Sequence, residues 1–418
     1  MGQLNNPISG TPWTDHTFPQ LMLQQASELG HRSAMREKRR GIWHAWSWAE
    51  VASDTRALAC GLKALGFVRG DRLVVIGDNR PRLYWAMCAV QMLGGVALPL
   101  AADTPVGALA ETLQTHRVRF AVADGQEQSD KLIEASAAHA DLQHILFDNG
   151  RGLQAGPNTR LCLLDEVIVN GRQFDRSKPA DLDREIAAGR GTDLAVILAY
   201  PEITLGSPAR AWTSGQQASQ SHTQGIAAAR ARLDTYGFGS KDEVLAYLPL
   251  GSWADQHFSF ALALAGGITV SFPESVDTVP IDIRELGPTL HVMPAWAYGQ
   301  LRALTLGRLK DANALHRQLF RFLVGEPGNT GTSSRSRGPL PWLGNLLIHA
   351  PLRDVLGLGR TKRLFVDGAN AKPEALHFFR AIGLTLEQVG DWRQNAGSEF
   401  APADSPMRVP TALARTER

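Results

Sequence analysis

Two hydrophobic periods alternate along the first 150 residues of the chain. In "WSWAEVASDTRALACGLKALG", Val51, Leu58, Leu62 and Leu65 fall on one face of a predicted helix that ends at Gly66. The short apolar runs "DRLVVIGD", "VALPL", "RFAVAD" and "HILFD" predict buried strands. "RPRLYWAMCAVQMLGG" predicts a helix with proline in its first turn, and "EQSDKLIEASAAHA" predicts another between the last two strands.

The same alternation resumes after a polar stretch from Asn149 to Arg190. "DLAVILAY", "EVLAYLPL", "ITVSF", "TLHVMP", "RLFVDG" and "LTLEQV" predict strands, and "FSFALALAGG", "PIDIREL" and "PEALHFFRAIG" predict helices. A long helical pattern begins at "AWAYGQLRALTLGRLK". Strands that alternate with helices imply parallel pairing, because each crossover needs a helix on a face of the sheet.

We therefore expect an α/β fold with two successive doubly wound, mainly parallel sheets flanked by helices. The predicted division is a first α/β subdomain over residues 11–190 and a second over residues 191–396. Residues 324–338, "VGEPGNTGTSSRSRG", predict a mobile loop because they are rich in glycine, serine and arginine. Residues 397–418 predict a frayed tail because they contain little apolar surface.

Charge and composition exclude several classes of protein. The 43 basic and 41 acidic residues give a formal charge of +2, so nothing points to a nucleic-acid partner. Cys60, Cys88 and Cys162 have no metal-binding or redox spacing and are expected to be core thiols in a reducing compartment. The longest apolar run, "FALALAGGITVSF", has 13 residues, whereas a bilayer span needs about 20. We expect a cytoplasmic protein without a transmembrane segment, and peripheral contact with a membrane stays open.

Several segments, in a fixed order, resemble the N-terminal part of the adenylate-forming enzymes, and most of all the long-chain acyl-CoA synthetases. They include "GDRLVVIGDNRPRLYWAMCAVQMLGGVALPL", "AYLPLGSWADQHFSFALALAGGITVSF" and "LFVDGANAKPEALHFFRAIGLTLEQV". The resemblance implies that family's fold from about Thr11 to about Gly397, without its β-rich subdomain and C-terminal domain. The family joins a carboxylic acid to AMP with Mg-ATP and passes the acyl group to coenzyme A. Its cleft shares the phosphate charge among magnesium, a lysine and backbone N–H donors.

The stretch "AYPEITLGSPARAW" occupies the place of the family's phosphate loop, Tyr-Thr-Ser-Gly-Thr-Thr-Gly-x-Pro-Lys-Gly. Tyr200, Thr204, Gly206 and Pro208 match this pattern. The hydroxyls, the first glycine and the lysine are replaced by Pro201, Glu202, Ile203, Leu205 and Ala209. Arg210, one residue further on, is a partial substitute for the lysine in the ligase alternative below. The segment is therefore either a relic of the phosphate loop or a plain strand-to-helix turn.

Two further segments bear on nucleotide binding. Gly368, Ala369 and Asn370 stand where the family's backbone runs along adenine. With Tyr200, Thr204, Gly206 and Arg210 they form the predicted vestigial nucleotide site. Where the family has Tyr-Gly-x-Thr-Glu, the chain has "GDWRQ", with the neutral Gln394 in place of the magnesium-binding glutamate. No catalytic or metal-binding residue is assigned.

The segment that borders the family's acyl pocket contains Trp253, His257 and Phe258. These residues are candidates for an apolar substrate pocket, with ordinary core packing as the alternative. The basic run "REKRR", from Arg36 to Arg40, predicts a solvated loop, with a phospholipid-facing patch as the sharper alternative.

Three functions remain in view. The lost phosphate-binding groups favour a catalytically inactive acyl-CoA synthetase-like protein that acts as a binding or regulatory module, with no cofactor expected and a fatty acyl chain as a compatible ligand. The second is a divergent AMP-forming fatty acid–CoA ligase that uses ATP, Mg and CoA and is completed by a partner domain. The third is a structural subunit, with a protein partner or a second copy covering the surface left by the missing subdomain.

Overall fold

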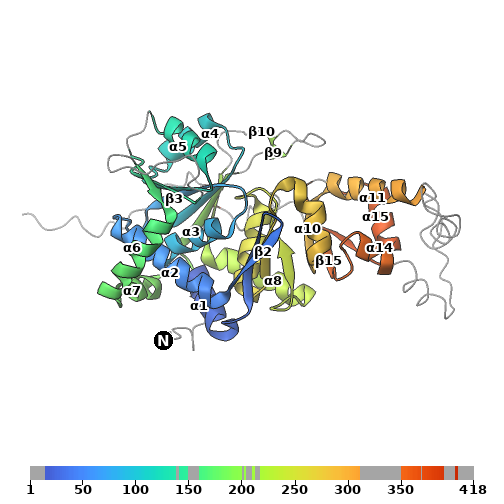
Figure 1. The fold of residues 1–418 in the computed structure, drawn as a ribbon, viewed down its shortest axis with the longest axis horizontal. Helices are drawn as coiled ribbons and strands as arrows, with labels where there is room; N and C mark the ends of the chain where they lie inside the picture. The colour runs from blue at the N-terminus through green and yellow to red at the C-terminus, as the bar shows by residue number, and fades with distance from the viewer. Residues whose placement is uncertain are drawn as a thin grey trace, which may run out of the picture.

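The computed structural model describes residues 15–137, 141–148, 160–199, 202–203, 210–211, 217–310, 350–368, 370–389 and 401–402. Strands and helices alternate along the chain and build two sheets that lie side by side (Figure 1). The predicted α/β fold with two mainly parallel sheets flanked by helices is confirmed. The predicted loop at 324–338 and most of the predicted tail at 397–418 lie outside the described residues.

The first sheet has eight strands in the order β17-β11-β8-β4-β3-β5-β6-β7. Neighbouring strands from β8 to β7 are parallel, whereas β11 runs antiparallel to both β8 and β17. Short apolar segments form the parallel strands because both faces of such a sheet are covered. The bounds are β3 Arg72–Gly77, β4 Val96–Ala101, β5 Phe120–Ala123, β6 His144–Phe147, β7 Leu161–Leu163, β8 Leu194–Ala199, β11 Gln217–Ser221 and β17 Ala401–Pro402.

Alternate residues of β3 enter different cores, so helices cover both faces of the first sheet. Leu73 and Val75 belong to the large core, and Val74 and Ile76 belong to a smaller core shared with α4 and α5. Figure 1 shows α4 and α5 on one side of β3, with α2, α3 and α6 on the other. The helices around this sheet are α1 Phe18–Leu29, α2 Trp48–Ala64, α3 Pro81–Met92, α4 Val106–Thr115, α5 Gln126–Ala135, α6 Leu164–Ser177, α7 Asp181–Ala188 and α8 His222–Tyr236.

Two glycines bring α6 against α2. A Cβ atom at Gly171 would lie 1.8 Å from the carbonyl oxygen of Ala57, and one at Gly61 would lie 2.3 Å from that of Val167. Only glycine permits helix backbones to approach so closely. The polar stretch from Asn149 to Arg190, where the sequence pattern indicated no element, therefore contains two packed helices. Their buried apolar side chains are Leu164, Val167, Ile168, Leu182 and Ile186.

The second sheet has seven strands in the order β16-β15-β14-β12-β13-β1-β2, and all its pairs are parallel except the β1–β2 hairpin. Its strands are β1 Ser33–Arg39, β2 Ile42–Ser47, β12 Glu243–Leu245, β13 Thr269–Phe272, β14 Leu290–Pro294, β15 Arg363–Asp367 and β16 Leu386–Gln388. The helical segments that accompany it are η2 Asp255–Ala261, which is π-helical, α9 Leu262–Gly266, η3 Val276–Thr278, α10 Val279–Leu286, α11 Ala295–Lys310, α14 Ala350–Val355 and α15 Pro373–Ala381. A short antiparallel pair, β9 Glu202–Ile203 and β10 Arg210–Ala211, stands apart from both sheets.

The sheets do not divide the chain at residue 190, where the sequence predicted a subdomain boundary. β1 and β2 precede that residue but extend the second sheet, because β1 pairs with β13 in the register of Met35 opposite Val270. β8 and β11 follow that residue but belong to the first sheet. The sheet to which a strand belongs depends on its hydrogen-bonding partner, which the hydrophobic pattern does not identify.

The basic run from Arg36 to Arg40 is not the solvated loop that the sequence predicted. Most of it forms β1, in which the side chains of Glu37 and Lys38 are buried. Lys38 Nζ donates to Asp282 Oδ1 at 2.8 Å and to Glu285 Oε2 at 2.6 Å. The long lysine side chain buries its stem while its ammonium keeps charged partners, so the run belongs to the packed fold.

The described residues contain neither a membrane-spanning helix nor a cluster of metal ligands. No helix in these ranges is both long and apolar enough to cross a bilayer. No group of three or more histidine, cysteine or acidic side chains in the same ranges could hold a metal ion. Cys60 and Cys88 are buried in the large core as predicted, and Cys162 is half-buried in the edge strand β7. Burial raises the pKa of the Cys60 thiol to about 12, which makes it unreactive.

Candidate functional site

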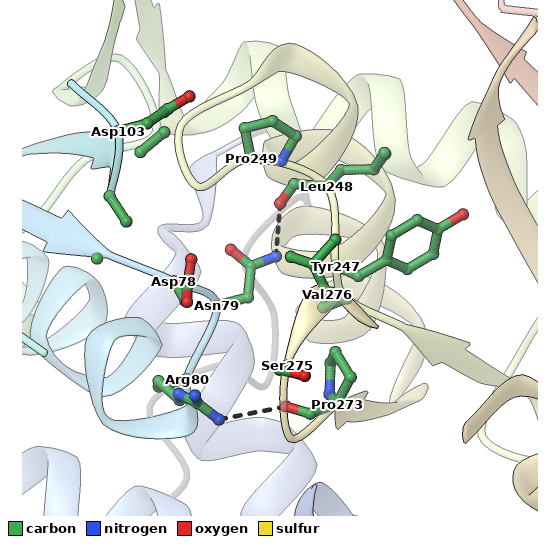
Figure 2. A pocket seen from close by; sticks show the side chains of 14 residues that line it. Asp78, Asn79, Arg80, Asp103, Tyr247, Leu248, Pro249, Pro273, Ser275 and Val276 are labelled. Atoms are coloured by element: carbon green, nitrogen blue, oxygen red, sulfur yellow. Dashed lines mark hydrogen bonds between the residues drawn. The ribbon is translucent and has the colours of Figure 1, made fainter. Parts of the chain in front are cut away.

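Strands from both sheets end at one crevice. The segments that follow β3 and β4 of the first sheet, and β12 and β13 of the second, enclose a cavity of about 230 Å³ (Figure 2). We call it the junction cavity. Its lining includes Asp78, Asn79 and Asp103 among the polar residues, and Ala101, Pro249 and Val276 among the apolar ones. In open α/β sheets ligands bind outside the carboxyl ends of the strands, so this crevice is the first candidate for a site.

Hydrogen bonds hold the side chain of Asn79 in one orientation. Its amide nitrogen donates to the carbonyl oxygen of Leu248 at 2.8 Å and to Asp255 Oδ1 at 3.0 Å. A flipped amide would place an oxygen against two oxygens, so the assignment of nitrogen and oxygen is settled by these partners. Figure 2 shows the oxygen, Oδ1, on the side of Asp78 and Asp103. Asn79 is 7% exposed, and Oδ1 has no hydrogen-bond partner among the described residues.

A buried carboxyl group supports Asn79 from the protein interior. Asp255, at the start of η2, is 1% exposed and accepts a hydrogen bond from Tyr84 Oη at 2.5 Å. Burial raises the pKa of Asp255 to about 7, and hydrogen bonds from Tyr84, Ser259, Asn79 and the Gly251 N–H oppose part of that rise. The carboxyl group therefore titrates near neutral pH, well above the range of an exposed aspartate.

Two exposed carboxylates and one arginine border the same cavity. Asp78 and Asp103 follow β3 and β4. The guanidinium of Arg80 donates to the carbonyl oxygen of Pro273 at 3.2 Å and to Glu37 Oε1 at 3.4 Å. The side chains of Asp78, Asn79 and Asp103 thus bring hydrogen-bond acceptors to a cavity that the Arg80 cation also lines.

A second cavity of about 600 Å³ lies at the carboxyl ends of β5 and β6, and we call it the charged groove. Arg82, in its lining, lies 2.8 Å from Asp148 Oδ1 and 2.7 Å from Asp165 Oδ1. Arg39 lies 2.6 Å from Glu37 Oε2. The two arginines compensate two of the three carboxylate charges in these pairs.

Comparison with known proteins shows which proteins this chain resembles. The family model described as AMP-binding enzyme matches residues 23–198. The chain is 26% identical over 380 residues to the long-chain-fatty-acid–CoA ligase FadD15 of Mycobacterium bovis, a match that covers 89% of this chain and 59% of that protein. Across these residues the chain resembles AMP-binding enzymes and long-chain fatty acid–CoA ligases. It is also 21% identical to the long-chain-fatty-acid–CoA ligase ACSBG1 of Bos taurus, across 97% of this chain and 55% of that one.

Two solved structures share the fold. The A-PCP didomain of carboxylic acid reductase from Segniliparus rugosus, in complex with AMP, matches with a TM-score of 0.62 and 15% identity, over 92% of this chain and 52% of that one. The anthranilate CoA ligase AuaEII, in complex with anthranoyl-AMP, matches with a TM-score of 0.63 and 12% identity, over 90% and 60%. This chain spans between half and three fifths of the length of the two curated relatives described above.

Much of the predicted nucleotide site lies outside the described residues, namely Tyr200, Thr204, Gly206 and Ala369. Gly368 directly follows β15 with a φ of +77°, and its carbonyl oxygen accepts a hydrogen bond from Gln388 Nε2 at 2.6 Å. Asn370 is exposed. A vestigial nucleotide site at these positions stays a prediction.

The phosphate-loop position is not a plain strand-to-helix turn. β9 and β10 pair antiparallel, with Arg210 opposite Ile203 and Ala211 opposite Glu202. β11 then runs antiparallel to β8 before α8 begins. The alternative of a plain turn was wrong because short strands lie between β8 and α8, and two-residue strands are too short to show an apolar period.

The three predicted pocket residues are buried in the large core. Trp253, His257 and Phe258 are 8%, 1% and 1% exposed. The ring of Trp253 stacks on that of His257 with centroids 4.3 Å apart, and the Arg232 guanidinium lies 5.1 Å from the centroids of both Trp253 and Phe258. Burial lowers the pKa of His257 to about 3, so its imidazole is neutral. The junction cavity and the charged groove are lined by other residues, and a substrate role for these three stays a prediction.

The sequence reasoning did not single out Asp78, Asn79, Tyr84, Asp103 or Asp255. The sequence did contain a signal for Asp78 and Asn79, because "GDN" directly follows a predicted buried strand and precedes a helix with proline at its start. Polar residues at the carboxyl end of a parallel strand are placed for ligand contact. No such signal marks Asp255, whose partners come from a different sheet.

Proposed function

We propose that this chain is a long-chain acyl-CoA synthetase-like protein that does not form adenylates and acts as a binding or regulatory module. The composition of its phosphate-loop position supports this proposal most directly. An adenylating cleft must neutralise the charge that develops on a triphosphate, and it uses backbone N–H groups, hydroxyls and a cation to do so. The corresponding positions here are mostly apolar or acidic.

Each replacement removes one of those groups. Pro201 has no N–H to donate, and the branched side chain of Ile203 disfavours the backbone conformations open to glycine. Ala209 replaces the cation. Glu202 adds an anion, and a unit charge about 4 Å from a phosphate at an effective dielectric of about 20 costs about 4 kcal/mol, or about a thousandfold in binding.

The test is pyrophosphate release by the purified full chain with Mg-ATP and saturated fatty acids of increasing length. We expect no release above the enzyme-free blank, and no binding heat with Mg-ATP at millimolar concentration. A rebuilt loop, carrying Glu202→Ser, Ile203→Gly, Leu205→Thr and Ala209→Lys, is the matched comparison. Mg-ATP binding by the rebuilt loop alone would attribute the loss to these positions, whereas fatty acid-dependent pyrophosphate release by the natural chain would refute the proposal.

A divergent fatty acid–CoA ligase is the second candidate, and Arg210 is the observation that favours it. This residue stands one position after Ala209, in β10, and supplies a cation beside the lysine position. In this case Mg-ATP and CoA are cosubstrates, and Arg210→Ala abolishes fatty acid-dependent pyrophosphate release. Arg190→Ala, an exchange of arginine at a position that matches no phosphate-loop residue, is the control and should leave the rate unchanged.

A further inference from the structure

The strand β2 forms an open edge of the second sheet. It pairs with β1 on one side, and no described strand lies on its other side. Its sequence, "IWHAWS", contains no lysine, arginine or carboxylate, and Ile42 is 63% exposed. Proteins usually protect such an edge with charged residues, proline or a covering segment, because an open apolar edge pairs readily with another strand.

Contacts on both faces hold β2 in place. On one face the ring of Trp46 contacts that of Trp85 in α3, with the centroids 5.8 Å apart. On the other face Trp43 Nε1 donates to Glu285 Oε2 in α10 at 3.1 Å. A strand that is already ordered loses little conformational freedom when another strand pairs with it, so the cost of association is small.

The hairpin determines which backbone groups reach the open edge. Its turn consists of Arg40 and Gly41, whose φ angles of +51° and +76° are those of a two-residue type I′ turn. The residue after the turn bonds back to β1, and from there residues that bond to β1 alternate with residues that do not. Every second residue from Ile42 therefore bonds to β1, and the N–H and C=O groups of Trp43 and Ala45 point to the open edge.

A second copy of β2 satisfies these groups in an antiparallel register. When Trp43 lies opposite Ala45 of the second copy, the two residues exchange both hydrogen bonds, and a two-fold axis repeats the exchange. The same register places His44 opposite its own copy on the axis and Ile42 opposite Trp46 of the second copy. Pairs of a β-branched and an aromatic residue across antiparallel strands are stabilising.

The charges beside the strand favour a second copy as the occupant. Arg40 precedes β2 and Glu50 follows it, and both are exposed. Hydrogen bonds from the Ser47 N–H and hydroxyl lower the pKa of Glu50, so its carboxylate is ionised at neutral pH. In an antiparallel pair the start of one strand lies beside the end of the other, so the cation of each copy lies on the side of the other copy's anion. The edge is therefore complementary to itself.

We propose that two copies of this chain associate through β2, which pairs antiparallel with β2 of the second copy across a two-fold axis at His44. The pairing joins the second sheets of the two copies into one continuous sheet. Two short strands bury less surface than the roughly 1,200–2,000 Å² of stable complexes, so we expect a reversible dimer. The inference does not depend on the proposed function, because its test involves neither ATP nor fatty acid.

Sedimentation equilibrium of the full chain under reducing conditions tests the association, from about 1 to about 200 µM protein. We expect the weight-average mass to rise with concentration from that of one chain toward that of two. The mass of a single chain at every concentration would overturn the proposal.

Variants locate the contact. Ala45→Pro removes an N–H that points to the open edge and leaves the bonds to β1 intact, and His44→Lys places two like charges opposite each other on the axis. We expect each to raise the dissociation constant at least tenfold. His377→Lys adds the same charge at an exposed histidine on α15 and should change the constant less than twofold. Unchanged association of Ala45→Pro, or equal weakening by the two lysine variants, would refute pairing through this edge.

A disulfide tests the register directly. Residues that face each other without hydrogen bonds in an antiparallel pair have Cα atoms about 4.5 Å apart, which is within the range of about 4.4–6.8 Å that a disulfide spans. His44→Cys should therefore form a covalent dimer when treated with oxidised glutathione. Ala45→Cys lies opposite Trp43 of the second copy rather than opposite itself and should not cross-link. Cross-linking through Ala45→Cys alone, or through neither variant, would overturn the assignment.

Discussion

The junction cavity and the charged groove both lie at the carboxyl ends of parallel strands, yet their polar groups are organised differently. In the groove, Arg82 bridges Asp148, whose side chain is 10% exposed, and the exposed Asp165. In the junction cavity, a buried network of Tyr84, Asp255 and Asn79 ends in an amide oxygen that no described residue satisfies. The larger number of charges is in the groove, but the buried polar network is beside the cavity.

The difference teaches that charge density alone is a poor guide to how much polar groups matter for stability. Ion pairs near the surface contribute about 0–1 kcal/mol, because water already solvates the separate charges. A buried acceptor without a partner loses its hydration and gains nothing in return, so removing a member of a buried network costs more. The predictions below compare the two regions, beginning with the largest effect.

Asp255→Ala should destabilise the fold by about 3–5 kcal/mol, because it leaves a cavity and removes the acceptor of the Tyr84 hydroxyl and the Asn79 amide. The midpoint of urea unfolding, followed by circular dichroism, measures the loss. Asp255→Asn preserves the shape and one acceptor oxygen and should cost less than half as much. A loss below about 1 kcal/mol for the alanine variant would mean that the network does not hold the crevice together.

The stability gap between the natural chain and Asp255→Asn should depend on pH. Burial raises the folded-state pKa of Asp255 to about 7, from an ordinary value of 3.8. The unfolded chain loses the proton first as the pH rises, so the contribution of Asp255 is complete below about pH 4 and declines up to about pH 7. The gap should narrow in that window by about 1.4 kcal/mol per pH unit at most.

Urea unfolding of both proteins at several values between pH 4.5 and 7.5 measures this dependence. Subtracting the two free energies of unfolding removes the contribution of groups that titrate alike in both proteins. One of these is the buried His222, whose pKa is lowered to about 3 by burial, so that its contribution to stability changes with pH in the opposite direction. A gap that stays constant across the window would mean that Asp255 is ionised throughout.

Arg82→Ala should cost about 1 kcal/mol in the charged groove, because it removes the partner of Asp148 and Asp165. Thermal unfolding in low and high salt is the measurement, and the difference between variant and natural chain should shrink as salt rises. Arg184→Ala, at a 76% exposed arginine that pairs with Asp181, is the matched control and should have almost no effect. A loss comparable with that of Asp255→Ala would erase the contrast between the two regions.

Glu127→Ala should have the smallest effect, about 0.3–0.5 kcal/mol. Glu127 is 72% exposed and pairs with Lys131 one turn further along α5, at 2.8 Å. Such helix-surface pairs are weak because the separated side chains are well hydrated. Urea unfolding at low ionic strength detects the change, and 0.5 M salt should remove most of it.

Elements with a strong apolar period were predictable from the sequence, and those held by pairing or close contact were not. The run that became β3 is apolar on both faces, so its burial follows from composition alone. The helices α6 and α7 lie in a polar stretch, and α6 packs against α2 through two glycines whose importance appears only when the backbones meet. The strand β1 is rich in charge and joins the second sheet by pairing with β13, beside which Lys38 finds Asp282 as a partner.

The candidate site was predictable only in part for a similar reason. The polar residues after β3 could be placed near a crevice by the rule for parallel strands, since that rule needs only the order of elements. The buried network could not be predicted from the sequence. Asn79 and Tyr84 are separated from Asp255 by more than 170 residues and meet it only where the two sheets come together.

The sequence by itself determined the α/β class, most of the parallel strands, the family resemblance and the loss of phosphate-binding residue types. These properties depend on local periodicity and residue identity. The tertiary structure alone decided which sheet each strand joins, which carboxyl group is buried, and which amide oxygen faces a cavity. Those properties depend on contacts between distant segments and on the water that those contacts exclude, and neither is written in the local order of residues.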